Sequence, residues 1–177
     1  MHNEKELVDQ CLKGNPKSQE ALYKQYAPRM YGVCMRYARN TLEADDILQE
    51  GFIKVFNFLK DYRQQGSLEG WIRRIVVNTA INYYRSKIHE WDEVNIDKVS
   101  GSPNLETSEI DNLSRDELLA QIQQLPEGYR LVFNLYVIEG YNHQEIGQLL
   151  NISENTSKSQ LSRARASLQE KITQRNK

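Results

Sequence analysis

Four polar side chains on one predicted helix have the best spacing for carboxylate chemistry: Asp45, Asp46, Gln49 and Glu50. Residues three to five positions apart share one side of an α-helix, and the apolar residues of this segment avoid that side. Two carboxylates can act as general acid and base, but that role needs neighbours that tune them and a site that excludes water. No histidine, lysine or arginine is patterned nearby, so we expect an acidic surface for a basic partner instead.

A second group of residues mixes aromatic rings with arginines and asparagines, in DYRQQGSLEGWIRRIVVNTAINYYRS, residues 61–86. Aromatic rings stack on unpaired bases and arginines contact the backbone, so this composition is typical of a surface that binds single-stranded nucleic acid. Core packing of the rings is the alternative, and it suits Tyr83 best. The candidate contacts are Arg63, Ser67, Trp71, Arg74, Asn78, Asn82 and Arg85.

A third group lies in NISENTSKSQLSRARASL, residues 151–168. At about 100° per residue, a core-facing stripe contains Ser157, Leu161, Ala164, Leu168 and Ile172. The opposite, polar side contains Asn155, Thr156, Ser159, Arg163 and Ala166, flanked by Gln160 and Ser162. Short polar side chains suit base contacts in a major groove, where Arg163 would bind guanine and Gln160 adenine. Lys158 and Arg165 lie nearer the apolar stripe and suit phosphates.

These residues need helices to position them, and the chain has the 3.6-residue apolar period almost throughout. Asn15-Pro16 predicts an N-cap and first helical position, Thr41 starts another helix, and Pro28 predicts a kink or break. The first helix has an apolar side composed of Leu7, Val8, Cys11 and Leu12. No strand alternation is found, so the sequence predicts an all-α protein.

The C-terminal part has the signals of a helix–turn–helix unit. Ser114 with Glu117, and Asn142 with Glu145, have capping-box spacing. Asn151 suits the left-handed end of a short helix, and Ser153 suits the cap of the next one.

The charges are unevenly distributed along the chain. Residues 1–90 have 14 Lys/Arg and 11 Asp/Glu (+3), residues 91–113 have one and six (−5), and residues 114–177 have eight and seven (+1). The middle segment also contains Ser100-Gly101-Ser102-Pro103 and no sustained apolar side. We therefore predict a helical domain over 1–90, a flexible acidic linker over 91–113 and a helix–turn–helix domain over 114–177.

Other classes of site are not indicated. Cys11 and Cys34 have apolar neighbours, as buried reduced thiols do, and the histidines are not paired with them. No metal and no cofactor are expected. The acidic start of the chain lacks the pattern of a secretory signal, so we expect a cytoplasmic protein without direct membrane insertion.

Four motifs follow one another along the chain: ALYKQYAPRMYGVCMRY, ADDILQEGFIKVF, SLEGWIRRIVVNTAINYYR and LPEGYRLVFNLYVIEGYNHQEIGQLLNISENTSKSQLSRARASL. Together they resemble the extracytoplasmic-function (ECF) sigma factors of bacteria, from about Leu7 to Ile172. The resemblance implies two domains, sigma region 2 and sigma region 4. It also implies a non-catalytic promoter-specificity subunit, which binds core RNA polymerase and directs transcription initiation at minus-35/minus-10 promoters.

The same resemblance implies roles for the three groups. The acidic side would bind the β′ clamp helices, the loop 63–70 with the following helix would open the minus-10 element and capture a flipped base, and Lys158, Ser159, Ser162 and Arg163 would recognise the minus-35 element. Region 4 would bind the β flap, and an anti-sigma factor would be a further partner. No small-molecule substrate is implied. Gln160 departs from the family, which usually has arginine there.

Two other classes fit parts of the pattern. One is a stand-alone helix–turn–helix regulator whose N-terminal half dimerises or binds a ligand; it would bind palindromic sites without polymerase. The other is a sigma mimic that sequesters a regulator and does not start transcription. The single recognition helix and the lack of a dimerisation seam disfavour the regulator.

Overall fold

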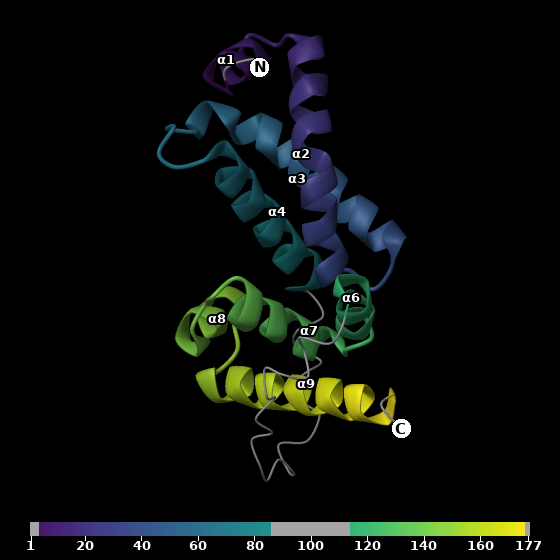
Figure 1. Cartoon of the computed structure of the whole chain (residues 1–177). Coiled ribbons are helices and arrows are strands. Elements are labelled where there is room, and N and C mark those ends of the chain that lie inside the picture. Colours follow the sequence, from purple (N-terminus) through teal and green to yellow (C-terminus); the bar gives the residue numbers. More distant parts are fainter. Residues whose placement is uncertain (1–3, 86–113, 176–177) are drawn as a thin grey trace. The chain divides into compact units, whose positions relative to one another are not determined.

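The computed structural model describes residues 4–85 and 114–175 (Figure 1). Regular structure within these ranges is entirely helical, which confirms the predicted fold class. The chain divides into two compact units, Met1–Ala80 and Ile81–Lys177. The predicted linker, residues 91–113, lies outside the described residues. Among the described helices, none has the length and apolar character that a membrane span requires.

The N-terminal unit has several helices, and the two that start at Pro16 and Thr41 begin where the sequence predicts. The helices of this part of the chain are α1 (Glu4–Leu12), α2 (Pro16–Tyr37), α3 (Thr41–Phe58), the short 3-10 helix η1 (Leu59–Asp61) and α4 (Leu68–Arg85). Asn15 Oδ1 accepts a hydrogen bond from Lys17 N at 3.0 Å, and Asn40 Oδ1 accepts one from Glu43 N at 2.9 Å. Each cap satisfies a backbone donor that the first helical turn leaves without a partner.

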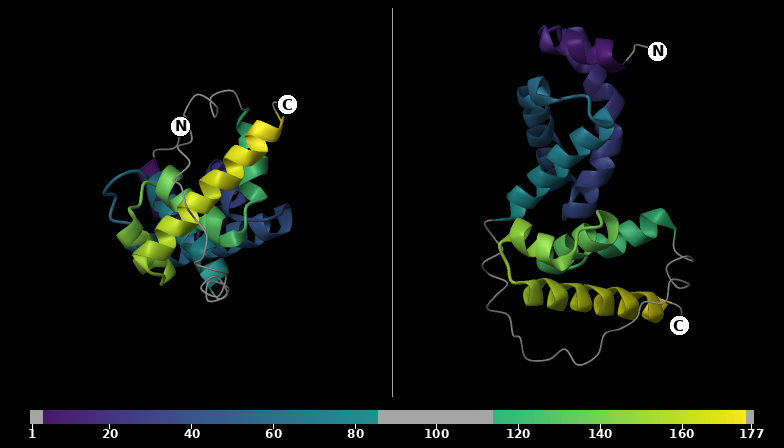
Figure 2. Two further views of the ribbon diagram at one scale, coloured as in Figure 1. Left: turned by 90° about the horizontal axis from the view of Figure 1, so that it is seen from below. Right: turned by 90° about the vertical axis from the view of Figure 1, so that its left-hand side faces the viewer.

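The helices α2, α3 and α4 pack through apolar sides that meet in the N-terminal core (Figures 1 and 2). Leu22 and Ile47 are fully buried on α2 and α3. Gly51 allows α3 to approach α4 closely, because an added Cβ would lie 3.2 Å from Val76 Cγ2. This packing presents the opposite sides of α3 and α4 to solvent.

Two expectations for the N-terminal helices are wrong. Of the kink or break expected at Pro28, the break does not occur, since α2 is continuous from Pro16 to Tyr37. Leu12 is not part of the buried side of α1; it is the last residue of the helix and is half exposed, whereas Leu7, Val8 and Cys11 are buried.

The C-terminal helices gather on one side of the longest of them. They are α6 (Arg115–Gln123), α7 (Glu127–Phe133), the π-helical segment η3 (Asn134–Ile138), α8 (His143–Leu150) and α9 (Glu154–Arg175). In both upright views α6, α7 and α8 lie on the same side of α9 (Figures 1 and 2). The predicted stripe faces them, because Ser157, Leu161, Ala164, Leu168 and Ile172 are all buried.

The predicted helix–turn–helix is confirmed by its caps. Capping boxes join Ser114 to Glu117 and Asn142 to Glu145. Asn151 ends α8 in the left-handed conformation at φ 56°, and Ser153 Oγ accepts a hydrogen bond from Thr156 N at 2.9 Å to start α9. The π-helical turn of η3 was not predicted; it begins at the buried Asn134, whose side chain donates to Arg130 O at 2.8 Å.

Both cysteines are buried and free, as predicted. Burial raises the pKa of the Cys11 thiol, and it raises the pKa of Cys34 to about 12. A thiolate is therefore disfavoured at either position. Within residues 4–85 and 114–175, no group of histidine, cysteine, aspartate and glutamate side chains is arranged to hold a metal.

Candidate polymerase and nucleic-acid interface

The acidic residues of α3 are exposed together, as their spacing predicts. Asp45, Asp46, Gln49 and Glu50 are all exposed. One expectation is wrong: a basic residue does lie beside them, since Lys54 Nζ is 2.6 Å from Glu50 Oε1. The pair is partly exposed, so it contributes little to stability and leaves the carboxylates hydrated.

Two apolar residues extend this surface, and neither was predicted to belong to it. Leu42 is 74% exposed and Ile53 is 61% exposed. Each lies three to four positions from the carboxylates, hence on the same side of α3. The sequence does contain a signal for them, because both residues fall outside the apolar stripe of their own helix. We call the combined surface the α3 docking face; it consists of Leu42, Asp45, Asp46, Gln49, Glu50 and Ile53.

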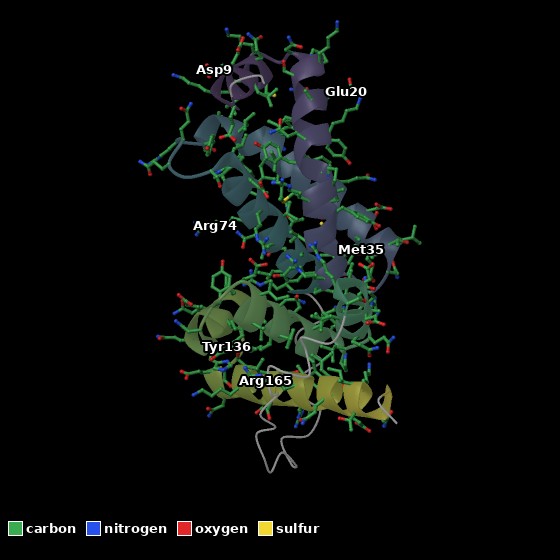
Figure 3. All side chains as sticks on the ribbon, viewed as in Figure 1. Asp9, Glu20, Met35, Arg74, Tyr136 and Arg165 are labelled. Atoms are coloured by element: carbon green, nitrogen blue, oxygen red, sulfur yellow. The ribbon has the colours of Figure 1, made fainter. Side chains whose placement is uncertain are left out.

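A second surface follows α4. Its members are spaced by three or four residues and therefore form one line along the helix; they are Trp71, Arg74, Asn78, Asn82 and Arg85. All are exposed except Trp71, which is half-buried. Arg74 points outward from the helix (Figure 3). We call this line the α4 stripe.

The loop before α4 is held in a defined shape. The Tyr62 hydroxyl donates to Gly66 O at 2.9 Å, and the Tyr62 ring lies 5.4 Å from that of Trp71. Gly66 has a φ of 89°, a conformation that glycine adopts without strain. Ser67 Oγ accepts a hydrogen bond from Gly70 N at 3.1 Å and so caps α4. Arg63 is exposed in this loop.

A cavity of about 230 Å³ lies between α1 and this loop. Its lining residues are Glu4, Lys5, Val8, Tyr62, Gln64 and Gly66. Glu4 Oε2 also accepts a hydrogen bond from the Tyr26 hydroxyl at 3.1 Å. Burial and the Glu4 carboxylate together raise the pKa of Tyr62. The phenol therefore stays protonated at neutral pH and remains a hydrogen-bond donor.

The third surface is the side of α9 that faces away from α7 and α8. Asn155 and Ser159 are exposed, and Thr156, Ser162 and Arg163 are half-buried. The expected exposure of Gln160 is wrong: its side chain is only 5% exposed, and Oε1 has no hydrogen-bond partner. A buried amide of this kind is not available to a base edge. The accessible residues form the α9 polar face: Asn155, Thr156, Ser159, Ser162 and Arg163.

Two basic residues lie along the edge of α9. Lys158 Nζ is 2.7 Å from Glu154 Oε1 in an exposed ion pair. Arg165 has its guanidinium carbon 5.8 Å from the centre of the Tyr136 ring. Tyr136 in turn stacks on His143, with ring centres 4.5 Å apart. No role at this surface was predicted for Tyr136 or His143, because a single aromatic residue gives no sign of its neighbour in space.

Comparison with known proteins accounts for both units. The family description Sigma-70 region 2 matches residues 22–89, and Sigma-70, region 4 matches residues 115–168. The chain is 29% identical to the ECF RNA polymerase sigma-E factor of Escherichia coli (strain K12), over 94% of this chain and 92% of that protein. It is 32% identical to the ECF RNA polymerase sigma factor SigE of Mycolicibacterium smegmatis, over 86% of this chain and 61% of that protein.

The chain belongs to the ECF sigma factors. This sigma factor directs RNA polymerase to promoters and is not catalytic. A similar fold is found in the sigma factor RpoE from Bartonella quintana, solved in complex with the anti-sigma factor NepR. That likeness has a TM-score of 0.51 and 19% identity, and it covers 88% of this chain and 96% of that one.

The family also bears on the alternatives drawn from the sequence. The region 2 match covers most of the N-terminal unit, where a stand-alone regulator would need a dimerisation or ligand domain. The region 4 match contains the helix–turn–helix and continues along α9 as far as Leu168.

Proposed function

We propose that the three surfaces divide the work of a sigma factor. The α3 docking face binds the β′ clamp helices of core RNA polymerase, the α4 stripe with its preceding loop binds the opened minus-10 element, and the α9 polar face recognises the minus-35 element. Region 4 binds the β flap. The observation that carries this proposal is the α3 docking face, whose carboxylates and flanking apolar residues are all solvent-exposed. A partner that has a basic centre and apolar residues at its margins complements such a surface.

The minus-10 assignment is supported by the line of exposed polar residues on α4. Trp71 offers a stacking face, and asparagines offer donors and acceptors to base edges. The cavity beside Tyr62 is the candidate place for an unstacked base. Stacking contributes about 1–3 kcal/mol per base, whereas each unstacked step costs a few kcal/mol. The chain therefore needs a larger machine to open a duplex.

The near-neutral charge of the chain is consistent with a protein that binds promoters only together with core polymerase. The whole chain has a net charge of −1. Affinity for DNA grows with the number of phosphates that a protein neutralises, so this protein alone should bind promoters weakly. Mounted on core polymerase in the cytoplasm, each unit adds a few specific contacts. We further propose that an anti-sigma factor binds this protein, as NepR binds the sigma factor RpoE from Bartonella quintana in their co-crystal structure.

Run-off transcription with purified core polymerase on genomic fragments tests the proposal. We expect defined transcripts that depend on this protein, and a variant with Asp46→Lys and Glu50→Lys should give none. A regulator would bind its sites without producing transcripts. A sigma mimic would bind core polymerase and remain silent at every fragment.

A further inference from the structure

Tyr136, His143 and Arg165 form a stacked cluster at the edge of α9, and none of the three residues belongs to the surfaces described above. The Tyr136 ring and the His143 imidazole are stacked, with 4.5 Å between their centres and 22° between their planes. The Arg165 guanidinium carbon lies 5.8 Å from the centre of the same Tyr136 ring. Figure 3 shows Tyr136 and Arg165 beside each other. The three side chains come from η3, α8 and α9 respectively.

The cluster is tied to the core side of α9. His143 Nδ1 lies 2.9 Å from Ser157 Oγ, and Ser157 is fully buried in the stripe that packs against the other helices. This hydrogen bond fixes the imidazole, and the imidazole supports one side of the Tyr136 ring. Tyr136 is therefore held at a fixed place beside α9.

The charge state of His143 suits this arrangement. Burial lowers its pKa, and the nearby cations Lys158 and Arg165 lower it further against the opposing effect of Glu154. The imidazole is thus neutral at pH 7 and does not repel the guanidinium. A neutral ring pair can accept a cation over its face.

Arg165 gains an orientation from this contact without using its hydrogen-bond donors. A guanidinium that stacks on an aromatic face keeps its N–H groups in the plane, where they can reach a phosphate. A free arginine loses substantial rotamer freedom when it binds, and a pre-oriented one loses less. The contact is intramolecular and exists before DNA arrives.

We propose that Tyr136 is a positioning residue for promoter binding: its ring holds Arg165 ready for a backbone phosphate beside the minus-35 element. The inference rests on the proposed function, which assigns the side of α9 to DNA. It adds Tyr136, a residue outside α9, to the residues that bind promoter DNA, and it assigns the Tyr136 ring the task of orienting Arg165. The competing explanation is that Tyr136 only packs η3 against α8.

The test uses holoenzyme assembled from core polymerase and the full chain, with a labelled duplex that carries a promoter found by the run-off screen. Tyr136→Leu removes the ring, and Tyr136→Phe keeps it. A cation–π contact of this kind corresponds to about a twofold to fivefold change in affinity. We expect Tyr136→Leu to weaken binding by that factor and Tyr136→Phe to stay close to the wild type.

Two further measurements separate positioning from packing. In a double-mutant cycle, Tyr136→Leu should have no further effect once Arg165→Ala is present, whereas its effect should add to that of Arg163→Ala on the polar face. The slope of log K against log salt should also become shallower by about 0.9 in Arg165→Ala, because one phosphate is no longer neutralised.

Equal losses from Tyr136→Leu in the wild-type and Arg165→Ala backgrounds would overturn the inference, as would a Tyr136→Phe variant as weak as Tyr136→Leu. Thermal unfolding of each full-length variant identifies a simple folding defect, and the Tyr136→Phe arm then decides the question. Transcription by wild-type holoenzyme on the same promoter tests the proposed function separately, whatever the Tyr136 variants do.

Discussion

Arg163 and Gln160 lie one helical turn apart on α9, and only Arg163 belongs to the polar face. Gln160 lies about 40° beyond Ala164, the nearest residue of the buried stripe, at 100° per residue. The predicted stripe was narrow, whereas a helix that packs against neighbours buries a side more than about 100° wide. Gln160 falls within that width and is 5% exposed. Angular position alone therefore predicted burial and exposure correctly at the centre of each side of α9, and it failed for Gln160, between the two sides.

Arg163→Ala tests the assignment of the polar face. An arginine that forms a bidentate bond to guanine contributes about 1–3 kcal/mol of discrimination against the wrong base. We expect holoenzyme with this change to bind its promoter more weakly by that amount and to tolerate other bases at one minus-35 position. Binding to a panel of single-base promoter variants measures both effects. Gln160→Ala is the matched control, and it should leave base preference unchanged; a uniform loss across the panel in Arg163→Ala would contradict base recognition.

Local signals predicted the helices better than they predicted the surfaces. Caps such as those of Asn142 and Ser153 depend on residues within one turn, so the sequence contains their whole cause. The π-helical turn at η3 contains the buried Asn134 and Leu135, and no local sequence pattern predicts it. Leu42 and Ile53 were missed for a different reason, because apolar periodicity indicates only the side of a helix that is buried.

A substitution at Gly147 tests the close packing of the helix–turn–helix. A Cβ at this position would lie 2.8 Å from Ile152 O, in the turn that joins α8 to α9. Since that atom belongs to the backbone, Gly147→Ala must displace the turn, at a cost of about 1–3 kcal/mol. Hydrogen exchange of α8 and α9 amides in the full chain should become faster.

Gly32 provides the matched control for this change. An added Cβ meets nothing within 4 Å at Gly32, which lies inside α2. Alanine in a helix interior is about 0.5–1 kcal/mol better than glycine, so Gly32→Ala should slow exchange in α2. Protection of α8 and α9 that is equal in Gly147→Ala and the wild type would contradict the close approach.

The cluster around His143 predicts a pH dependence for the same elements. Its pKa is lowered from the ordinary value of 6.5, chiefly by burial and then by Lys158 and Arg165, with Glu154 opposing. The unfolded chain therefore binds a proton at a higher pH than the folded chain does. The contribution of His143 to stability is complete above pH 6.5 and is lost as the pH falls through the lower folded value.

Thermal unfolding of the full chain, followed by circular dichroism at about pH 7.5 and about pH 5.5, measures this effect. We expect the wild type to lose more stability on acidification than His143→Gln does. Exposed carboxylates titrate mainly below this window. Identical losses in the two proteins would show that His143 does not change its protonation on unfolding.

At the scale of the molecule, each of the surfaces is small. Their combined effect on a promoter depends on core polymerase, to which we propose that both units bind. The α3 docking face offers four polar side chains and two apolar ones, and the α9 polar face offers five side chains. A net charge of −1 gives little general attraction to DNA. The central claim is therefore that core polymerase makes the two units act together on one promoter.

The most direct test follows opening of a promoter labelled with a fluorescent base in the minus-10 element. It compares core polymerase alone, the free chain, the two together, and core polymerase with the variant Asp46→Lys, Glu50→Lys. A control variant, Asp9→Lys with Glu20→Lys, makes the same charge change at exposed positions on α1 and α2 (Figure 3). We predict opening only for the wild type and the control variant with core polymerase, because the α3 variant places positive charges where a basic partner must dock. Opening by the free chain, or equal opening with the α3 variant, would contradict the account.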